Sequence, residues 1–304
     1  MLTWQVHLIL VAGLFAIGTV VGSFLNVCIY RIPWQKSVIW PASHCPRCWQ
    51  AILPIDNIPI VSWLALRGEC RHCGEPVSAR YPLVELLVGL LFAGVYVSDV
   101  IYGAANPLVN LPSGLALRLA YHLMLVALLI TATFIDYDLT IIPDQVTVTG
   151  MILGLGLGTL FPEIRPDPSS ARSHWDGFVV GVMGLLVGGG LTWSVRILGT
   201  LAFRREAMGF GDVTLMAMIG SFLGWQAAIL TFFIAPFFGL GHALWKLIAF
   251  LGKWISGRRA SSTDRELPFG PYLSMAALML LLGWPRLWQG WARGLFETLN
   301  ALFA

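Results

Sequence analysis

Long apolar stretches alternate with short polar ones along most of this chain. Predominantly apolar windows of about 20 residues are long enough to cross a bilayer as helices. The pattern therefore predicts an all-α polytopic membrane protein with about eight transmembrane helices. We expect them at 8–29, 82–98, 113–135, 144–162, 176–198, 212–225, 226–250 and 270–285. The boundary between the sixth and seventh, at Trp225/Gln226, has the weakest signal.

Composition agrees with this reading. Of the 304 residues, 57% are hydrophobic and only 12% are charged, and the mean hydropathy is +0.75. These values exclude a soluble domain whose surface must meet water. The first apolar stretch is preceded by no Lys or Arg and lacks a clear cleavage site, so we expect 1–29 to stay as the first span. Residues 291–304 mix Trp and Arg with apolar residues, which is typical of an interfacial tail.

Basic residues are unevenly distributed between the loops. One group of loops carries Arg31, Lys36, Arg47, Arg67, Arg71, Arg80, Arg204, Arg205, Lys253, Arg258, Arg259 and Arg265. In the alternate loops, 99–112 has no basic residue and 163–175 has only Arg165 and Arg172. The positive-inside rule makes the first group cytoplasmic and puts both termini on the outer side. The net charge of +3 then follows from topology, and we expect no nucleic-acid partner.

The predicted cytoplasmic loop at 30–81 holds four of the five cysteines. Cys45-x2-Cys48 and Cys70-x2-Cys73 are separated by 21 residues. This spacing lets four thiolates surround one Zn²⁺ at about 2.3 Å. Two disulfides are the alternative, which a reducing cytoplasm disfavours. We therefore expect a small zinc-binding domain, inserted between the first two helices and held by its metal where a hydrophobic core is too small.

Aspartates gather at the same predicted membrane edge. Asp136 ends the third apolar stretch in "FIDYDLTIIPD", and Asp212 opens the sixth in "GFGDVTL". Two carboxylates in a partly dry site cannot both ionise, so they share a proton and can act as base and acid on a water molecule. Peptide hydrolysis suits such a pair. Asp136 adjoins its apolar stretch most closely and is the predicted partner of Asp212.

Other carboxylates have simpler explanations. Asp144 follows Pro143 at the start of a span, where we expect helix capping. Asp138 would point away from Asp136 on a helix and is expected to be a solvated charge. Glu85 fits a helix start or a functional role equally well. A proton- or ion-coupled transporter also places aspartates in membranes and remains the alternative, although it predicts mid-bilayer carboxylates and an internal repeat.

Several motifs together resemble the bifunctional type IV prepilin peptidases, in the same order and over nearly the whole chain. They are "VGSFLNVCIYRIP", the two cysteine motifs, "IDNIPIVSWLALRGECRHC", "SARYPLVELL", "FIDYDLTIIPD", "GFGDVTLMAMIGSFLGW" and "PFGPYL". The GxGD element, Gly209 to Asp212, is shared with presenilin-like intramembrane aspartyl proteases. Joined to the four-cysteine loop, it is specific to the prepilin peptidases.

The resemblance implies two reactions at the cytoplasmic face of a bacterial inner membrane. The basic leader of a type IV prepilin or type II secretion pseudopilin is removed after a glycine, and the new N-terminal amine is methylated with S-adenosylmethionine. The two catalytic aspartates of the family map onto Asp136 and Asp212, within a peptidase domain at 82–290, and methyl transfer is placed in the loop at 30–81.

Two departures from the family pattern stand out. Many relatives have Lys where this chain has Thr214, and the stretch from Pro33 to Cys45 is shorter than in many of them. A peptidase without methyltransferase activity is therefore a second alternative. No Gly-rich nucleotide motif locates the methyl donor.

Overall fold

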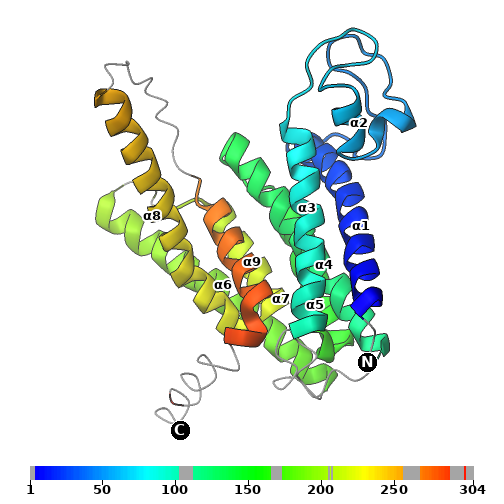
Figure 1. The fold of residues 1–304 in the computed structure, drawn as a ribbon. Coiled ribbons are helices and arrows are strands. Elements are labelled where there is room, and N and C mark those ends of the chain that lie inside the picture. The colour runs from blue at the N-terminus through cyan, green and yellow to red at the C-terminus, as the bar shows by residue number, and fades with distance from the viewer. Residues whose placement is uncertain are drawn as a thin grey trace. The chain divides into compact units, whose positions relative to one another are not determined.

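The structure is a computed structural model of the chain that describes residues 4–102, 112–165, 173–204, 206, 208–255, 268–287 and 298. Among these residues the regular elements are helices (Figure 1), and two isolated bridges, His44 with Ala51 and Glu69 with Pro76, are the only β pairs. The predicted all-α class is confirmed. The predicted tail at 291–304 lies outside the described residues apart from Thr298.

Long helices occur at each of the predicted spans. They are α1 (Trp4–Arg31), α3 (Arg80–Tyr96), α4 (Pro112–Leu139), α5 (Asp144–Leu160), α6 (His174–Phe203), α7 (Phe210–Leu223), α8 (Trp225–Ile255) and α9 (Gly270–Leu287). Within the described residues, five helices, α1, α3, α4, α6 and α8, are long and apolar enough to cross a membrane, whereas α7 and α9 form shorter apolar segments. A polytopic membrane protein is confirmed, and the count of eight spans stays a prediction. Gly224, with φ of +86°, ends α7 one residue before the predicted boundary.

The chain divides into two compact units, Met1–Thr131 with Leu282–Ala304 and Ala132–Leu281. In the first unit, α1 lies along α3 (Figure 1) because small residues let the two backbones approach. A Cβ added at Gly18 would lie 2.8 Å from the Cα of Gly89, and one at Gly22 would lie 2.8 Å from the Cα of Glu85. The short elements η1 (Ile32–Trp34), η2 (Pro54–Asn57) and α2 (Val61–Ala65) lie between α1 and α3 in sequence.

A buried charged cluster joins two helices of the first unit. Asp99 lies in the π-helical extension of α3 (Val97–Tyr102). Its Oδ2 is hydrogen-bonded to His122 Nδ1 of α4 at 2.6 Å, and its Oδ1 lies 3.6 Å from Arg118 Nε. All three side chains are buried. Ionisable groups inside a membrane protein are expected to pair in this way.

In the second unit, α6 and α7 approach until their backbones touch. A Cβ at Gly184 would meet the carbonyl oxygen of Gly220, and one at Gly188 would meet that of Met216. Arg165, one of the two basic residues of the predicted outer loop, is fully buried and does not face water. Its guanidinium donates to the carbonyl of Ser221 at 2.7 Å, so it satisfies the C-terminal end of α7.

Candidate active site and cysteine cluster

The structure buries two of the four aspartates singled out from the sequence. Asp136 lies in the last turn of α4 and Asp212 in the first turn of α7, and both are buried. Asp138 and Asp144 are exposed. Exposure agrees with the solvated charge expected of Asp138. The predicted capping role of Asp144 is wrong, because Pro143 is the N-cap of α5 and no side chain caps this end.

The two buried aspartates are linked through Ile142. Asp136 Oδ2 accepts a hydrogen bond from the backbone N–H of Gly270 at 3.0 Å. A Cβ at Gly270 would lie 3.0 Å from Ile142 Cδ1, and a Cβ at Gly211 would lie 2.9 Å from Ile142 Cβ. The Ile142 side chain therefore packs against both Gly270, which binds Asp136, and Gly211, which precedes Asp212. The two carboxyl groups are close enough to interact electrostatically.

The four predicted metal ligands converge in the loop at 30–81, which we call the cysteine loop. The sulfur atoms of Cys45, Cys48, Cys70 and Cys73 all lie within 4.8 Å of one another. The Cys45 and Cys73 sulfurs are 3.9 Å apart, near the ~3.8 Å that tetrahedral geometry with 2.3 Å bonds requires. All four are free cysteines, so the disulfide alternative is wrong. The cluster could hold a metal ion.

Comparison with known proteins identifies the family. Residues 16–98 match the "Bacterial Peptidase A24 N-terminal domain", and residues 123–244 match the "Type IV leader peptidase family". The chain is 38% identical over 278 residues to the "Prepilin leader peptidase/N-methyltransferase" of Myxococcus xanthus, covering 91% of this chain and 74% of that protein. This chain belongs to the type IV leader peptidase family.

Other members of the leader peptidase family give the same result. Proteins of the same description from Aeromonas hydrophila and Pseudomonas putida are each 33% identical, and each alignment covers 88% of this chain. They are covered over 89% and 88% of their own lengths. No solved structure matches the chain significantly.

In this leader peptidase family member, Arg196 of α6 supports the segment just before Asp212. Its Nε donates to the Met208 carbonyl at 3.0 Å, and its guanidinium carbon lies 5.8 Å from the centre of the Phe210 ring. These contacts flank Gly209, the N-cap of α7, and a Cβ added at Gly209 would lie 3.6 Å from Asp212 Oδ2. No sequence pattern predicts this role, because Arg196 lies within a predicted span and its partners, Met208 and Phe210, come after the next loop.

Glu85 takes a role that the sequence left open. It is buried, and its Oε2 accepts the backbone N–H of Ile60 at 2.7 Å. Ile60 has a positive φ of 62°, a conformation that a β-branched residue adopts only when its surroundings hold it. Glu85 therefore ties the cysteine loop to α3.

The two cysteine motifs form the same backbone turn. Cys45 N–H donates to the Gln50 carbonyl at 3.0 Å, and Cys70 N–H donates to the Glu75 carbonyl at 2.9 Å. The fourth residue after the first cysteine has positive φ in both turns. It is Trp49 (φ 60°) in one and Gly74 (φ 69°) in the other.

Backbone groups of the two turns also change the pKa values of the thiols. Backbone N–H groups of Cys48 and Arg47 lower the pKa of the Cys45 thiol to about 6. The Glu75 backbone works in the same direction on Cys73, but desolvation and the three neighbouring thiols prevail and raise its pKa to about 12. One thiolate therefore forms readily, whereas ionisation of all four needs a cation among them.

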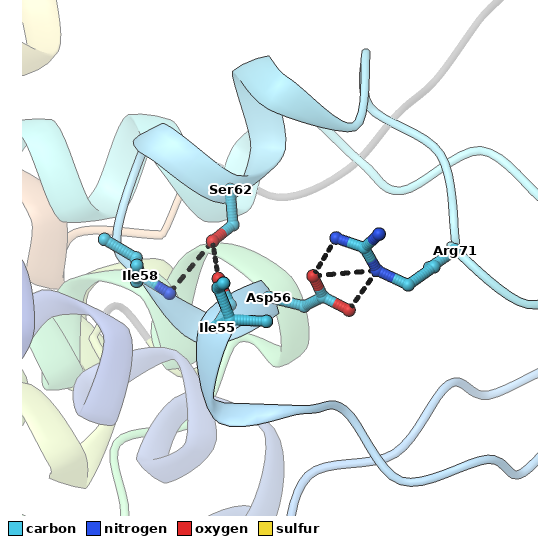
Figure 2. A network of polar contacts seen from close by, with 5 residues as sticks. All are labelled: Ile55, Asp56, Ile58, Ser62 and Arg71. Atoms are coloured by element: carbon cyan, nitrogen blue, oxygen red, sulfur yellow. Dashed lines mark hydrogen bonds and ion pairs between the residues drawn. The ribbon is translucent and has the colours of Figure 1, made fainter.

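A polar network organises the link between the two cysteine motifs (Figure 2). Arg71 donates from Nη2 to Asp56 Oδ1 at 2.6 Å and from Nε to Oδ2 at 2.8 Å. These hydrogen bonds hold the pKa of Asp56 below its usual range. Because Arg71 lies directly after Cys70, the pair connects η2 to the second cysteine motif.

Proposed function

We propose that this protein removes the leader peptide of type IV prepilins or type II secretion pseudopilins and then methylates the new N-terminus. The observation that carries the proposal is the burial of both Asp136 and Asp212 in a member of the leader peptidase family, next to glycines that pack on Ile142. The relatives are described as prepilin leader peptidases and N-methyltransferases. Membership of a peptidase family does not favour the transporter alternative.

In the proposed mechanism Asp136 and Asp212 share one proton. The ionised carboxylate takes a proton from a water molecule, which attacks the carbonyl carbon of the scissile bond while the protonated carboxyl group polarises the carbonyl oxygen. The tetrahedral intermediate then collapses as the leaving amine is protonated. The Gly270 N–H at 3.0 Å orients Asp136, and packing of both glycines on Ile142 keeps the pair in place. Individual roles are not assigned, because a coupled pair titrates as a unit.

The proposed metal is a structural Zn²⁺ bound by Cys45, Cys48, Cys70 and Cys73. Four thiolates in this arrangement fill a tetrahedral zinc site and leave no position for substrate, which is typical of structural sites. The metal would fix the cysteine loop, where we place methyl transfer. S-adenosylmethionine would supply the methyl group, and the free amine produced by cleavage is the nucleophile.

The proposed arrangement keeps the sequence boundaries. These are a first span at 1–29, a cytoplasmic zinc-binding domain at 30–81, a peptidase domain at 82–290 and an interfacial tail at 291–304. The cysteine loop and the substrate junction face the cytoplasm of a bacterium, and both termini lie on the outer side of its inner membrane. The excess of basic residues in loop 30–81 supports this orientation.

The test is incubation of the purified protein with a leader-bearing prepilin, with and without S-adenosylmethionine, followed by mass spectrometry. We expect loss of the leader in both samples and a further gain of one methyl group only when the methyl donor is present. An intact prepilin in both samples would contradict the proposed function. Cleavage without methylation would support the alternative of a peptidase that lacks methyltransferase activity.

A further inference from the structure

A segment of the cysteine loop has its polar atoms inside and its apolar side chains outside. Ser62 is buried, and its hydroxyl donates to the Ile55 carbonyl at 2.7 Å and accepts the Ile58 N–H at 3.0 Å (Figure 2). The exposed fractions are 65% for Ile55, 47% for Ile58, 59% for Val61 and 63% for Leu64. We call residues 55–64 the apolar segment. Exposure of these apolar side chains to water is unfavourable.

Part of this face belongs to one helix. Val61 and Leu64 are three residues apart in α2, so they lie on the same side of the helix. Ser62 points to the other side, where its partners are backbone atoms of the same segment. The exposed apolar side chains therefore follow from how the segment folds locally.

The apolar segment is hydrogen-bonded to α3, which is one of the predicted membrane spans. Ile60, in its middle, donates its N–H to Glu85 at 2.7 Å. Glu85 lies five residues beyond Arg80 at the start of α3, or about 7.5 Å along a helix axis at 1.5 Å per residue. Other side chains of α3, including Leu83 and Leu90, are exposed and apolar, as expected of a lipid-facing surface.

A second part of the cysteine loop is held at the end of α1 in a similar way. Arg31 is buried and donates to the carbonyls of Ser37 at 3.0 Å and Pro41 at 2.7 Å. The residues between them include Ile39 and Trp40, which are exposed. Trp beside a span is typical of the membrane interface.

We propose that the apolar segment inserts into the boundary between lipid headgroups and acyl chains, so that the cysteine loop lies on the bilayer. The lipid surface is the occupant that fits, because the Ile60–Glu85 hydrogen bond holds the segment beside a predicted span whose exposed side chains are apolar. Interfacial helices bury an apolar face by about 5–10 Å in this region. The inference does not depend on which reaction the protein catalyses.

The test places a trifluoromethyl-phenylalanine at Leu64 in the full chain, reconstituted in lipid nanodiscs. Fluorine spectra are recorded with a spin-labelled lipid and, separately, with a water-soluble gadolinium chelate. A probe at Val61 must repeat the result. The matched control is a probe at Arg47, in the same loop, whose side chain is 72% exposed and paired with Glu75.

We expect the spin-labelled lipid to broaden the Leu64 and Val61 signals several-fold while the gadolinium chelate leaves them sharp, with the opposite result at Arg47. Broadening of the Leu64 signal by gadolinium alone would overturn the proposal, because the segment would then face water. Protection from both agents would also overturn it, since a protein surface such as a substrate helix or a second copy would cover the segment.

Discussion

The two candidate sites of this chain are held together by different forces. Asp136 lies in the last turn of α4 and accepts a hydrogen bond from Gly270 of α9, and Asp212 opens α7, whose backbone touches that of α6 at glycines. Helix packing therefore sets their positions. The four cysteines lie in a loop with only short helical elements, where backbone turns, the Asp56–Arg71 pair and the thiol cluster provide the order. A site built from packed helices should survive loss of a metal, and a site built around a metal should not.

The largest effect is expected at the aspartates. Asp212→Asn or Asp136→Asn keeps the side-chain shape but removes the acid–base cycle, so leader cleavage should fall by several orders of magnitude. Asp138→Asn is the matched control and should change the rate little, because Asp138 is exposed. Initial rates of prepilin cleavage measure this, and near-normal cleavage by Asp212→Asn would refute the aspartate pair.

The next largest effect is expected from substitutions that disrupt the cysteine cluster and leave the aspartates unchanged. Cys45→Ser or Cys70→Ser should abolish binding of the proposed zinc ion and disorder the cysteine loop, which metal analysis and hydrogen exchange would detect. Methylation should be lost while cleavage falls only a few-fold. Cys28→Ala is the control, since Cys28 is buried in α1 outside the cluster. A reduced, chelator-free preparation of the parent protein that contains no zinc would sink this account.

Gly270→Ala tests the packing around the aspartates. An added Cβ would lie 2.5 Å from Asp136 Oδ2. Relief of such overlap costs about 1–3 kcal/mol, which corresponds to about a 5- to 160-fold lower kcat if the full cost falls on the transition state. Gly241→Ala is the control, because nothing lies within 4 Å of its added Cβ. Equal rates for the two variants would show that this contact does not position Asp136.

A smaller effect is expected at Arg196, which supports the start of α7. Arg196→Ala removes the hydrogen bond to Met208 and the contact with Phe210, so we expect about a tenfold lower kcat with little change in KM. Arg196→Lys keeps a cation and should recover part of the loss. A rise in KM alone would instead assign Arg196 to substrate binding.

The smallest effect compares the two cysteine turns. Gly74 has φ of 69° and open space around an added Cβ, so Gly74→Ala should destabilise the loop only through backbone strain, by about 1 kcal/mol. The equivalent Trp49 already bears this strain and stacks on His44, with ring centres 5.1 Å apart. Zinc affinity measured by competition with a chelator would report the change, and no loss in Gly74→Ala would show that the turn can relax.

The sequence predicted the helices and the cysteine cluster well, because both depend on local patterns. Apolar windows locate helices directly, and the Cys-x2-Cys spacing brings two ligands together within one turn. Burial separated Asp136 from Asp138, as expected from how closely each adjoins the apolar stretch.

The supporting contacts could not be predicted in the same way. The hydrogen bond from Gly270 to Asp136 joins residues 134 positions apart, and the one from Arg165 to Ser221 joins residues 56 apart. Such pairs depend on how helices pack in space, which hydropathy does not encode. The only local trace was the "PFGPYL" motif, which contains Gly270.

Two separately held sites are tested most directly by methylation of a pilin that is supplied already cut, using the Asp212→Asn and Asp136→Asn variants with S-adenosylmethionine. Methyl transfer needs only a free N-terminal amine and a folded cysteine loop. We predict that mass spectrometry will show one added methyl group at a rate close to that of the parent protein. Loss of methylation in these variants, with zinc still bound, would contradict two separately held sites and show that they act as one.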